Sequence, residues 1–280
     1  MNAADGPIVV LLLRSRPETL TIVRGMLSGL AELLEMDPEL LDDLKTSVSE
    51  ACNNVVLHAY RTEPGPMEVR VHADPDALRV IVRDEGVGPA ELLSRGEDAH
   101  GIGVSVIEAL AREARFAPRE GGGTEVTMVF DGARDGRPLF AVPGVAGAEP
   151  PLPPPPNGEI SLSLSPVSLL SGVLGRLART LAAGAHFSLD RFSDVYLVTD
   201  TLAAHATRAA ATDRVRARMS AADRRLRIEL GPFRPGAAAS LTEKEEDRIS
   251  SPLALLADEI AVRETHEGEV VDVIVVDHRP

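Results

Sequence analysis

Three polar residues recur at four-residue intervals along one predicted helix: Glu50, Asn54 and His58. Residues four apart lie one helical turn apart, so the side chains of Glu50 and Asn54 can reach one point in space. Carboxylate and carboxamide oxygens suit a hard cation such as Mg²⁺, and a carboxylate can take a proton from a hydroxyl group. His58 continues the row and faces either bound phosphate or its own protein surroundings. Polar helix residues are usually only solvated, so a ligand-binding role for this row depends on the segments that follow it.

The first of these segments is Asp84-Glu-Gly-Val-Gly88. Asp84 stands where a predicted buried strand ends, and Gly86 and Gly88 permit positive φ and a close approach of the backbone to a ligand. Taken alone, the segment also fits an ordinary turn after a strand.

The second segment is Gly101-Ile-Gly103, which includes Ile102 and leads into a predicted helix at 104–113. The unpaired amides and positive dipole end of such a helix can hold phosphates. The segment lacks the Gly-Lys-Ser/Thr of a Walker loop and the third glycine of the dinucleotide pattern. The sequence therefore disfavours these two nucleotide-binding folds.

The helix that carries the polar row begins at Asp37-Pro38, where Asp caps the helix and Pro occupies its first turn. Its apolar residues share one stripe that faces the core: Leu41, Leu44, Val48, Ala51, Cys52, Val55 and Ala59. Glu50 and Asn54 point away from that stripe, so the helix carries a separate polar face.

The other elements of the first part place this helix in a layered fold. In chain order, the sequence predicts a strand at 8–13, helices at 17–35 and from 37, strands at 67–72 and 78–83, a loop at 89–100, a helix at 104–113 and a strand at 124–130. We expect an α+β fold, a two-layer α/β sandwich with helices on one face of a mostly antiparallel sheet.

A proline-rich segment divides the chain into two parts. Proline fixes φ and removes backbone donors, so residues 137–156 are predicted to form an extended linker between domains at 1–136 and 157–280. The second part repeats the order of the first, with strands at 160–164, 214–219, 225–230 and 270–276 and helices at 167–183, 192–210 and 252–263.

This repetition predicts an internal duplication whose second copy is degenerate. Aligning the two helices places Thr201, His205 and Ala209 opposite Glu50, Asn54 and His58 in turn. The polar row is lost in the second copy, as are the glycine motifs. An unrelated α/β domain, or a domain that recognises a partner, is the alternative.

Composition limits the classes of function. The chain has 280 residues, 29 basic and 43 acidic, with a formal charge of −14, which argues against nucleic-acid binding. The single cysteine excludes an intramolecular disulfide and a cysteine-based zinc site, and fits a reducing compartment. The apolar run at 8–13 is too short for a signal peptide or membrane span. We expect a cytoplasmic protein with no membrane partner.

Together, these motifs resemble the Bergerat ATP-binding fold of the GHKL superfamily, and within it the anti-sigma factor serine kinases. The N box matches Ser49-Glu-Ala-Cys-Asn-Asn54 with His58, the G1 box Asp84-x-Gly-x-Gly88, the G2 box Gly101-x-Gly103 and the G3 box Gly123-Thr124. The resemblance covers residues 8–131, and four motifs in the right order are a strong signal. The short loop at 89–100 and the few residues before the first strand separate the chain from gyrases, Hsp90, MutL and sensor histidine kinases.

The resemblance implies ATP and Mg²⁺ as cofactors, with Asn54 as the metal ligand and Glu50 as the general base. It implies that Asp84 accepts the adenine amino hydrogen, which guanine lacks, with Thr124 close by. The glycines of the G1 and G2 boxes would hold the nucleotide, and we expect further phosphate contacts from Arg95 and His100.

The function implied is that of an anti-sigma regulator with serine/threonine kinase activity. Such a protein sequesters a sigma factor and uses Mg-ATP to phosphorylate a serine of a STAS-type anti-anti-sigma partner. The alternative is a non-catalytic module that binds ATP and regulates by sequestration. The family also implies a homodimer, or here an internal pseudo-dimer of the two halves.

Overall fold

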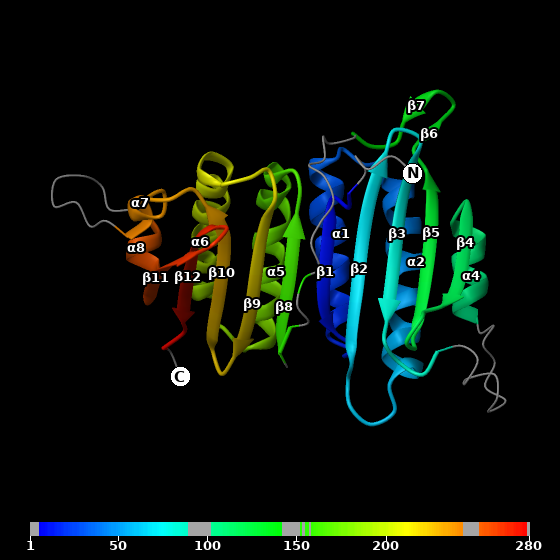
Figure 1. Ribbon diagram of the computed structural model, residues 1–280, viewed down its shortest axis with the longest axis horizontal. Coiled ribbons are helices and arrows are strands. Elements are labelled where there is room, and N and C mark those ends of the chain that lie inside the picture. The colour runs from blue at the N-terminus through cyan, green and yellow to red at the C-terminus, as the bar shows by residue number, and fades with distance from the viewer. Residues whose placement is uncertain are drawn as a thin grey trace. The chain divides into compact units, whose positions relative to one another are not determined.

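The computed structural model describes residues 6–88, 102–141, 152, 155–156, 158–242 and 252–278. The chain divides into two compact units, Met1–Asn157 and Gly158–Pro280, which we describe one at a time. Figure 1 shows a sheet with helices on one of its faces in each unit. Within the described residues, no helix has the length and apolar character needed to cross a membrane.

The first unit contains one antiparallel sheet in the order β1-β2-β3-β5-β4. Its strands are β1 (Val9–Arg14), β2 (Pro66–Asp74), β3 (Ala77–Asp84), β4 (Glu113–Pro118) and β5 (Thr124–Asp131). Its helices are α1 (Thr19–Leu33), α2 (Pro38–Asn54) and α4 (Ile102–Leu110), and a π-helical turn, η1 (Val55–Ala59), follows α2 directly. The predicted α+β class, with helices on an antiparallel sheet, is confirmed.

Helix α2 begins as the sequence predicts. The Asp37 carboxylate accepts hydrogen bonds from the amides of Glu39 at 3.0 Å and Leu40 at 3.3 Å, and Pro38 occupies the first helical position. Such a cap stabilises a helix by about 1 kcal/mol. Most of the predicted stripe is buried, with Leu44, Val48, Ala51 and Cys52 at most 1% exposed. The opposite face of α2 is therefore left free for the polar row.

A small hairpin closes the first unit. Strands β6 (Ala133–Arg134) and β7 (Arg137–Pro138) pair with each other, and Leu139 and Phe140 are buried after them. The Asp37 amide donates to the Leu139 carbonyl at 2.7 Å, and the Ala141 amide donates to the Leu34 carbonyl at 2.6 Å. These bonds hold the segment after the hairpin against the junction of α1 and α2.

The second unit has its own antiparallel sheet, in the order β11-β12-β10-β9-β8. Its strands are β8 (Glu159–Leu164), β9 (Val215–Ala222), β10 (Arg225–Phe233), β11 (Glu259–Thr265) and β12 (Gly268–Val276). Its helices are η2 (Val167–Leu169), α5 (Leu170–Gly184), α6 (Leu189–Ala209), α7 (Ala239–Thr242) and α8 (Pro252–Leu256).

The structure corrects two predicted helices. The helix expected at 104–113 ends at Leu110, and strand β4 follows it, although no strand was predicted there. The helix expected at 252–263 ends at Leu256, and its second half forms strand β11. Both strands are sheet edges in which no residue is buried, so neither carries the run of buried apolar positions that marks an inner strand.

Candidate functional site

The N-terminal end of α4 lies directly against the polar row of α2. A Cβ atom built on Gly103 would be 2.8 Å from Glu50 Oε2, 3.6 Å from Asn54 Oδ1 and 3.7 Å from Asn54 Nδ2. No side chain fits at the first of these distances without moving the carboxylate. Glycine therefore allows the start of α4 and the two polar side chains to come together. Both Glu50 and Asn54 are partly exposed, so they remain accessible to a ligand.

The chain leaves α-helical geometry immediately after Asn54. Residues Val55–Ala59 form the π-helical turn η1, in which each amide bonds five residues back rather than four. His58 lies within this turn, and its side chain is exposed. The structure thus brings Glu50 and Asn54 together at Gly103, whereas His58 makes no contact with Gly103.

Asp84 ends strand β3, as predicted, and its side chain is buried with 3% exposure. The Asp84 carboxylate accepts a hydrogen bond from the Gly86 amide at 2.8 Å. It also accepts from both the amide and the hydroxyl of Thr124, the first residue of β5. A carboxylate has about four acceptor positions, so a ligand N–H can be accepted beside these three donors.

The pKa of Asp84 is raised above its usual value. Burial is the main cause, because it disfavours the charged carboxylate. The hydrogen bonds from Gly86 and Thr124 and the nearby charge of Arg119 act in the opposite direction. Asp84 is thus a buried hydrogen-bond acceptor, and the donors of Gly86 and Thr124 stabilise its ionised form.

Two glycines of the G1 segment allow close packing for different reasons. A Cβ atom on Gly86 would lie 2.1 Å from the carbonyl oxygen of Ala59, the last residue of η1. The next amide, of Val87, donates to that same oxygen at 3.0 Å. Gly88 instead has a φ of +77°, which favours glycine. The G1 segment is therefore attached to the end of the helix that carries Glu50 and Asn54.

The remaining glycine-rich turn brings Thr124 to Asp84. Gly123 has a φ of +89°, and a Cβ atom there would lie 2.1 Å from the Asp84 carbonyl oxygen. Glycine at 123 therefore lets the start of β5 approach the end of β3, which places the Thr124 donors at the Asp84 carboxylate.

Some predicted contacts lie outside the described residues, namely Gly101, Arg95 and His100. Ile102 is described and is 86% exposed at the first position of α4. The structure thus brings together Glu50, Asn54 and Gly103 at one place, and Asp84, Gly86 and Thr124 at another.

Sequence reasoning did not identify Tyr60 and Arg119. The Tyr60 hydroxyl accepts from the Glu85 amide at 2.8 Å, and an Arg119 guanidinium nitrogen donates to the Asp84 carbonyl at 2.6 Å. Both bonds reach backbone atoms, which no motif of side chains reveals.

The buried Cys52 takes no part in this chemistry. Complete burial raises the pKa of its thiol to about 12, so the nucleophilic thiolate does not form near neutral pH.

The end of strand β10 in the second unit is apolar. Strand β10 ends in Phe233, whose side chain is fully buried and contacts His205 edge to face, with ring centroids 5.1 Å apart. Burial, followed by the charges of Arg208 and Arg234, lowers the pKa of His205. This end of β10 offers an apolar ring where β3 offers a carboxylate.

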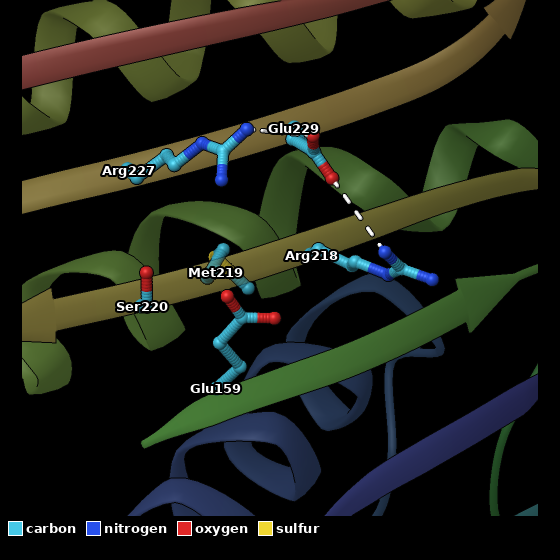
Figure 2. Close-up of a pocket in the computed structure, with 6 residues that line it drawn as sticks. All are labelled: Glu159, Arg218, Met219, Ser220, Arg227 and Glu229. Carbon is cyan, nitrogen blue, oxygen red and sulfur yellow. Dashed lines mark hydrogen bonds and ion pairs between the residues drawn. The ribbon is translucent and has the colours of Figure 1, made fainter. Parts of the chain in front are cut away.

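A hollow on the sheet of the second unit is lined by charged residues of β8, β9 and β10 (Figure 2). Glu229 pairs with Arg227 at 2.9 Å and lies 4.0 Å from Arg218, and Arg227 also pairs with Asp272 at 2.7 Å. The charges are thus engaged with one another, so this hollow is a poorer ligand site than the first unit.

The residues of the first unit fit Mg-ATP. Glu50 and Asn54 supply the oxygen atoms that Mg²⁺ prefers, beside a helix start with the polarity that holds phosphates. The buried Asp84 carboxylate can accept an amino group of a purine. These groups and the fold support a nucleotide site whose base end is Asp84 and whose phosphate end is Glu50 and Asn54.

The chain is similar to known proteins over its first part. Residues 13–130 match the histidine kinase-like ATPase domain. The chain is 33% identical to the serine-protein kinase RsbW of Bacillus subtilis (strain 168) over 138 residues, which is 43% of this chain and 84% of that protein. It is 35% identical to the serine-protein kinase RsbW of Listeria innocua serovar 6a, over 40% of this chain and 81% of that protein. Because the chain covers 84% and 81% of these two relatives at 33% and 35% identity, it belongs to the RsbW family of histidine kinase-like ATPases.

Proposed function

We propose that this protein is a Mg-ATP-dependent serine/threonine protein kinase that acts as an anti-sigma factor. The observation that carries the proposal is the placement of Glu50 and Asn54 against Gly103 at the start of α4. That placement joins a carboxylate, a carboxamide and a phosphate-binding helix end at one point. Kinase activity in the named relatives supports the same reading.

Asp84 and Thr124 form the base-binding end of the proposed site. The ionised Asp84 carboxylate accepts the amino hydrogen of adenine, and the Thr124 and Gly86 donors hold that carboxylate in place. Guanine has a carbonyl oxygen at the same position, which a carboxylate repels. The first unit therefore selects ATP over GTP.

Glu50, Asn54 and the start of α4 form the phosphate end. Asn54 Oδ1 is the proposed ligand for Mg²⁺, and the free amides of α4 hold phosphate oxygens. Bound Mg-ATP supplies the phosphoryl group that is transferred. Glu50 accepts the proton of the attacking serine hydroxyl at a carboxylate oxygen, and it orients that hydroxyl towards the phosphate. Transfer of this kind depends chiefly on positioning, which the contact of α2 with α4 provides.

The second unit is proposed to be a degenerate copy of the first. The two units share the chain order of their strands and the neighbours of each strand within its sheet. They also share one close approach: a Cβ atom on Gly123 would lie 2.1 Å from the Asp84 carbonyl oxygen, and one on Gly268 would lie 2.3 Å from that of Phe233. These two parallels support a common origin for the two units.

The second unit is not expected to bind ATP. Phe233 stands where Asp84 stands in the first unit, and it packs against His205. The Glu269 carboxylate accepts from the amides of Gly236 at 2.6 Å and Ala238 at 2.9 Å, so an internal carboxylate satisfies the amides after β10. We therefore propose one ATP per chain and a role for the second unit other than nucleotide binding.

The partners proposed for this chain are a sigma factor and a STAS-type anti-anti-sigma protein. Co-purification of the full chain with Mg-ATP, followed by mass spectrometry, tests this assignment. The proposal predicts that a STAS-type protein is recovered and that one serine of it becomes phosphorylated. Recovery of a partner that stays unphosphorylated would favour a non-catalytic ATP-binding module that acts by sequestration.

A further inference from the structure

One peptide group of the first unit is held by two side chains, one at each polar atom. It joins Asp84 to Glu85, at the point where strand β3 ends. Its N–H donates to the Tyr60 hydroxyl oxygen at 2.8 Å, and its C=O accepts from the Arg119 guanidinium at 2.6 Å. The peptide immediately follows the proposed adenine acceptor, so its orientation helps to set the direction of the Asp84 side chain.

Tyr60 is itself fixed by the structure around it. Its hydroxyl donates to the Pro66 carbonyl at 2.6 Å while it accepts from Glu85. Its ring packs so closely on Gly65 that a Cβ atom there would lie 2.0 Å from the ring carbon Cε1. Burial raises the pKa of Tyr60 to about 12, so the hydroxyl keeps the proton that it donates. Tyr60 thus links the end of the N box helix, the start of β2 and the G1 segment.

Arg119 reaches the same peptide from the turn between β4 and β5. Its amide donates to the Gly123 carbonyl at 3.1 Å, and its own carbonyl accepts from the Gly122 amide at 3.2 Å, which closes the glycine turn. Gly123 is the residue whose close approach to Asp84 brings Thr124 to the carboxylate. Arg119 therefore connects the turn that carries the Thr124 donors to the backbone of the residue that accepts them.

We propose that Tyr60 and Arg119 are positioning residues that set the adenine selectivity of Asp84 by clamping the Asp84–Glu85 peptide. The inference rests on the proposed function, because it requires that Asp84 accepts the adenine amino group. Without these two hydrogen bonds the Asp84–Glu85 peptide can rotate, and the Asp84 carboxylate is no longer held in one orientation. Recognition of the amino group then weakens, while the phosphate end of the site, on Glu50 and Asn54, is unaffected.

The test compares two nucleotides on the full chain. Inosine triphosphate has a carbonyl where ATP has the amino group and an N1–H where ATP has an acceptor nitrogen, and its phosphates are the same, so the ratio of its dissociation constant to that of ATP reports on the base end of the site. Tyr60→Phe removes only a hydroxyl, and Arg119→Met removes only the guanidinium donors. Tyr196→Phe, on the exposed face of α6, and Arg115→Met, exposed on β4, are the matched controls.

We expect each clamp variant to bind ATP about 3- to 10-fold more weakly, as for loss of one hydrogen bond, with inosine triphosphate affinity unchanged. The dissociation constant of inosine triphosphate divided by that of ATP then falls in both clamp variants and in neither control. A general loss of stability would weaken both nucleotides equally, so an unchanged ratio in folded variants overturns the clamp. If one variant fails to fold, the other carries the test. A wild-type chain that binds ATP no better than inosine triphosphate would instead overturn the proposed role of Asp84, and the clamp with it.

Discussion

Replacing Gly103 with Ala separates the chemistry of the site from the stability of the fold. The new Cβ atom would stand 2.8 Å from Glu50 Oε2, about 0.6 Å inside an ordinary carbon–oxygen contact. The flexible carboxylate can move away at little cost, but it then leaves its working position. Because a misplacement of 1 Å can cost about 100-fold in rate, we expect phosphate transfer to fall by about 10-fold. Gly103 is the second residue of α4 and the new Cβ atom meets only the end of a flexible side chain, so we expect little change in the free energy of unfolding.

The assay pairs single-turnover transfer of labelled phosphate to the partner serine with denaturant unfolding of the same sample. Gly184→Ala is the matched control, because Gly184 is also helical and a Cβ atom there meets nothing within 4 Å. We expect the control to transfer phosphate at the wild-type rate. Wild-type transfer by a folded Gly103→Ala variant would refute the placement of Glu50 beside the start of α4 as the basis of catalysis.

Three further predictions concern Asp84 and the second unit. The raised pKa of Asp84 means that ATP affinity should fall as pH is lowered through that pKa, because the protonated carboxyl is no longer a full acceptor. The contribution of Asp84 to the free energy of unfolding has the opposite pH dependence. It is present below the ordinary aspartate pKa and is lost as the pH rises through the raised pKa. Asp84→Asn should therefore remove the pH dependence of ATP affinity, measured by calorimetry, and that of stability, measured by unfolding titrations. Gly123→Ala and Gly268→Ala should each destabilise the protein by about 2 kcal/mol or more, since both force a side chain against a carbonyl oxygen at positive φ. Only Gly123→Ala should weaken ATP binding. Equal effects of the two variants on ATP affinity would contradict the proposal that only the first unit binds ATP. Calorimetric titration of the full chain should give one ATP per chain, and two equivalent sites would contradict a degenerate second unit.

Much of the first unit follows from local signals in the sequence. The start of helix α2 could be placed to the residue because Asp37 and Pro38 mark it, and the apolar stripe that follows repeats at the helical period. The end of β3 at Asp84 follows from a run of alternating apolar residues that stops there. These elements carry their own patterns, so one sequence was sufficient.

The features that were missed lack a strong side-chain pattern of their own. No residue of the edge strands β4 and β11 is buried, so their pairing with β5 and β12 defines them. The π-helical turn after Asn54 follows no residue pattern that we identified. The clamp of Tyr60 and Arg119 reaches backbone atoms, and its residues are separated by β2, β3, α4 and β4.

Replacement of Glu50 by Gln tests the central claim most directly, because Gln keeps the size and polarity of the side chain and removes only its basicity. The measurement is transfer of labelled phosphate from Mg-ATP to the serine of the co-purified partner, with ATP affinity measured on the same preparations. If Glu50 is the base, ATP should still bind while transfer falls by about 100-fold or more. Undiminished transfer by the Glu50→Gln variant would contradict the account.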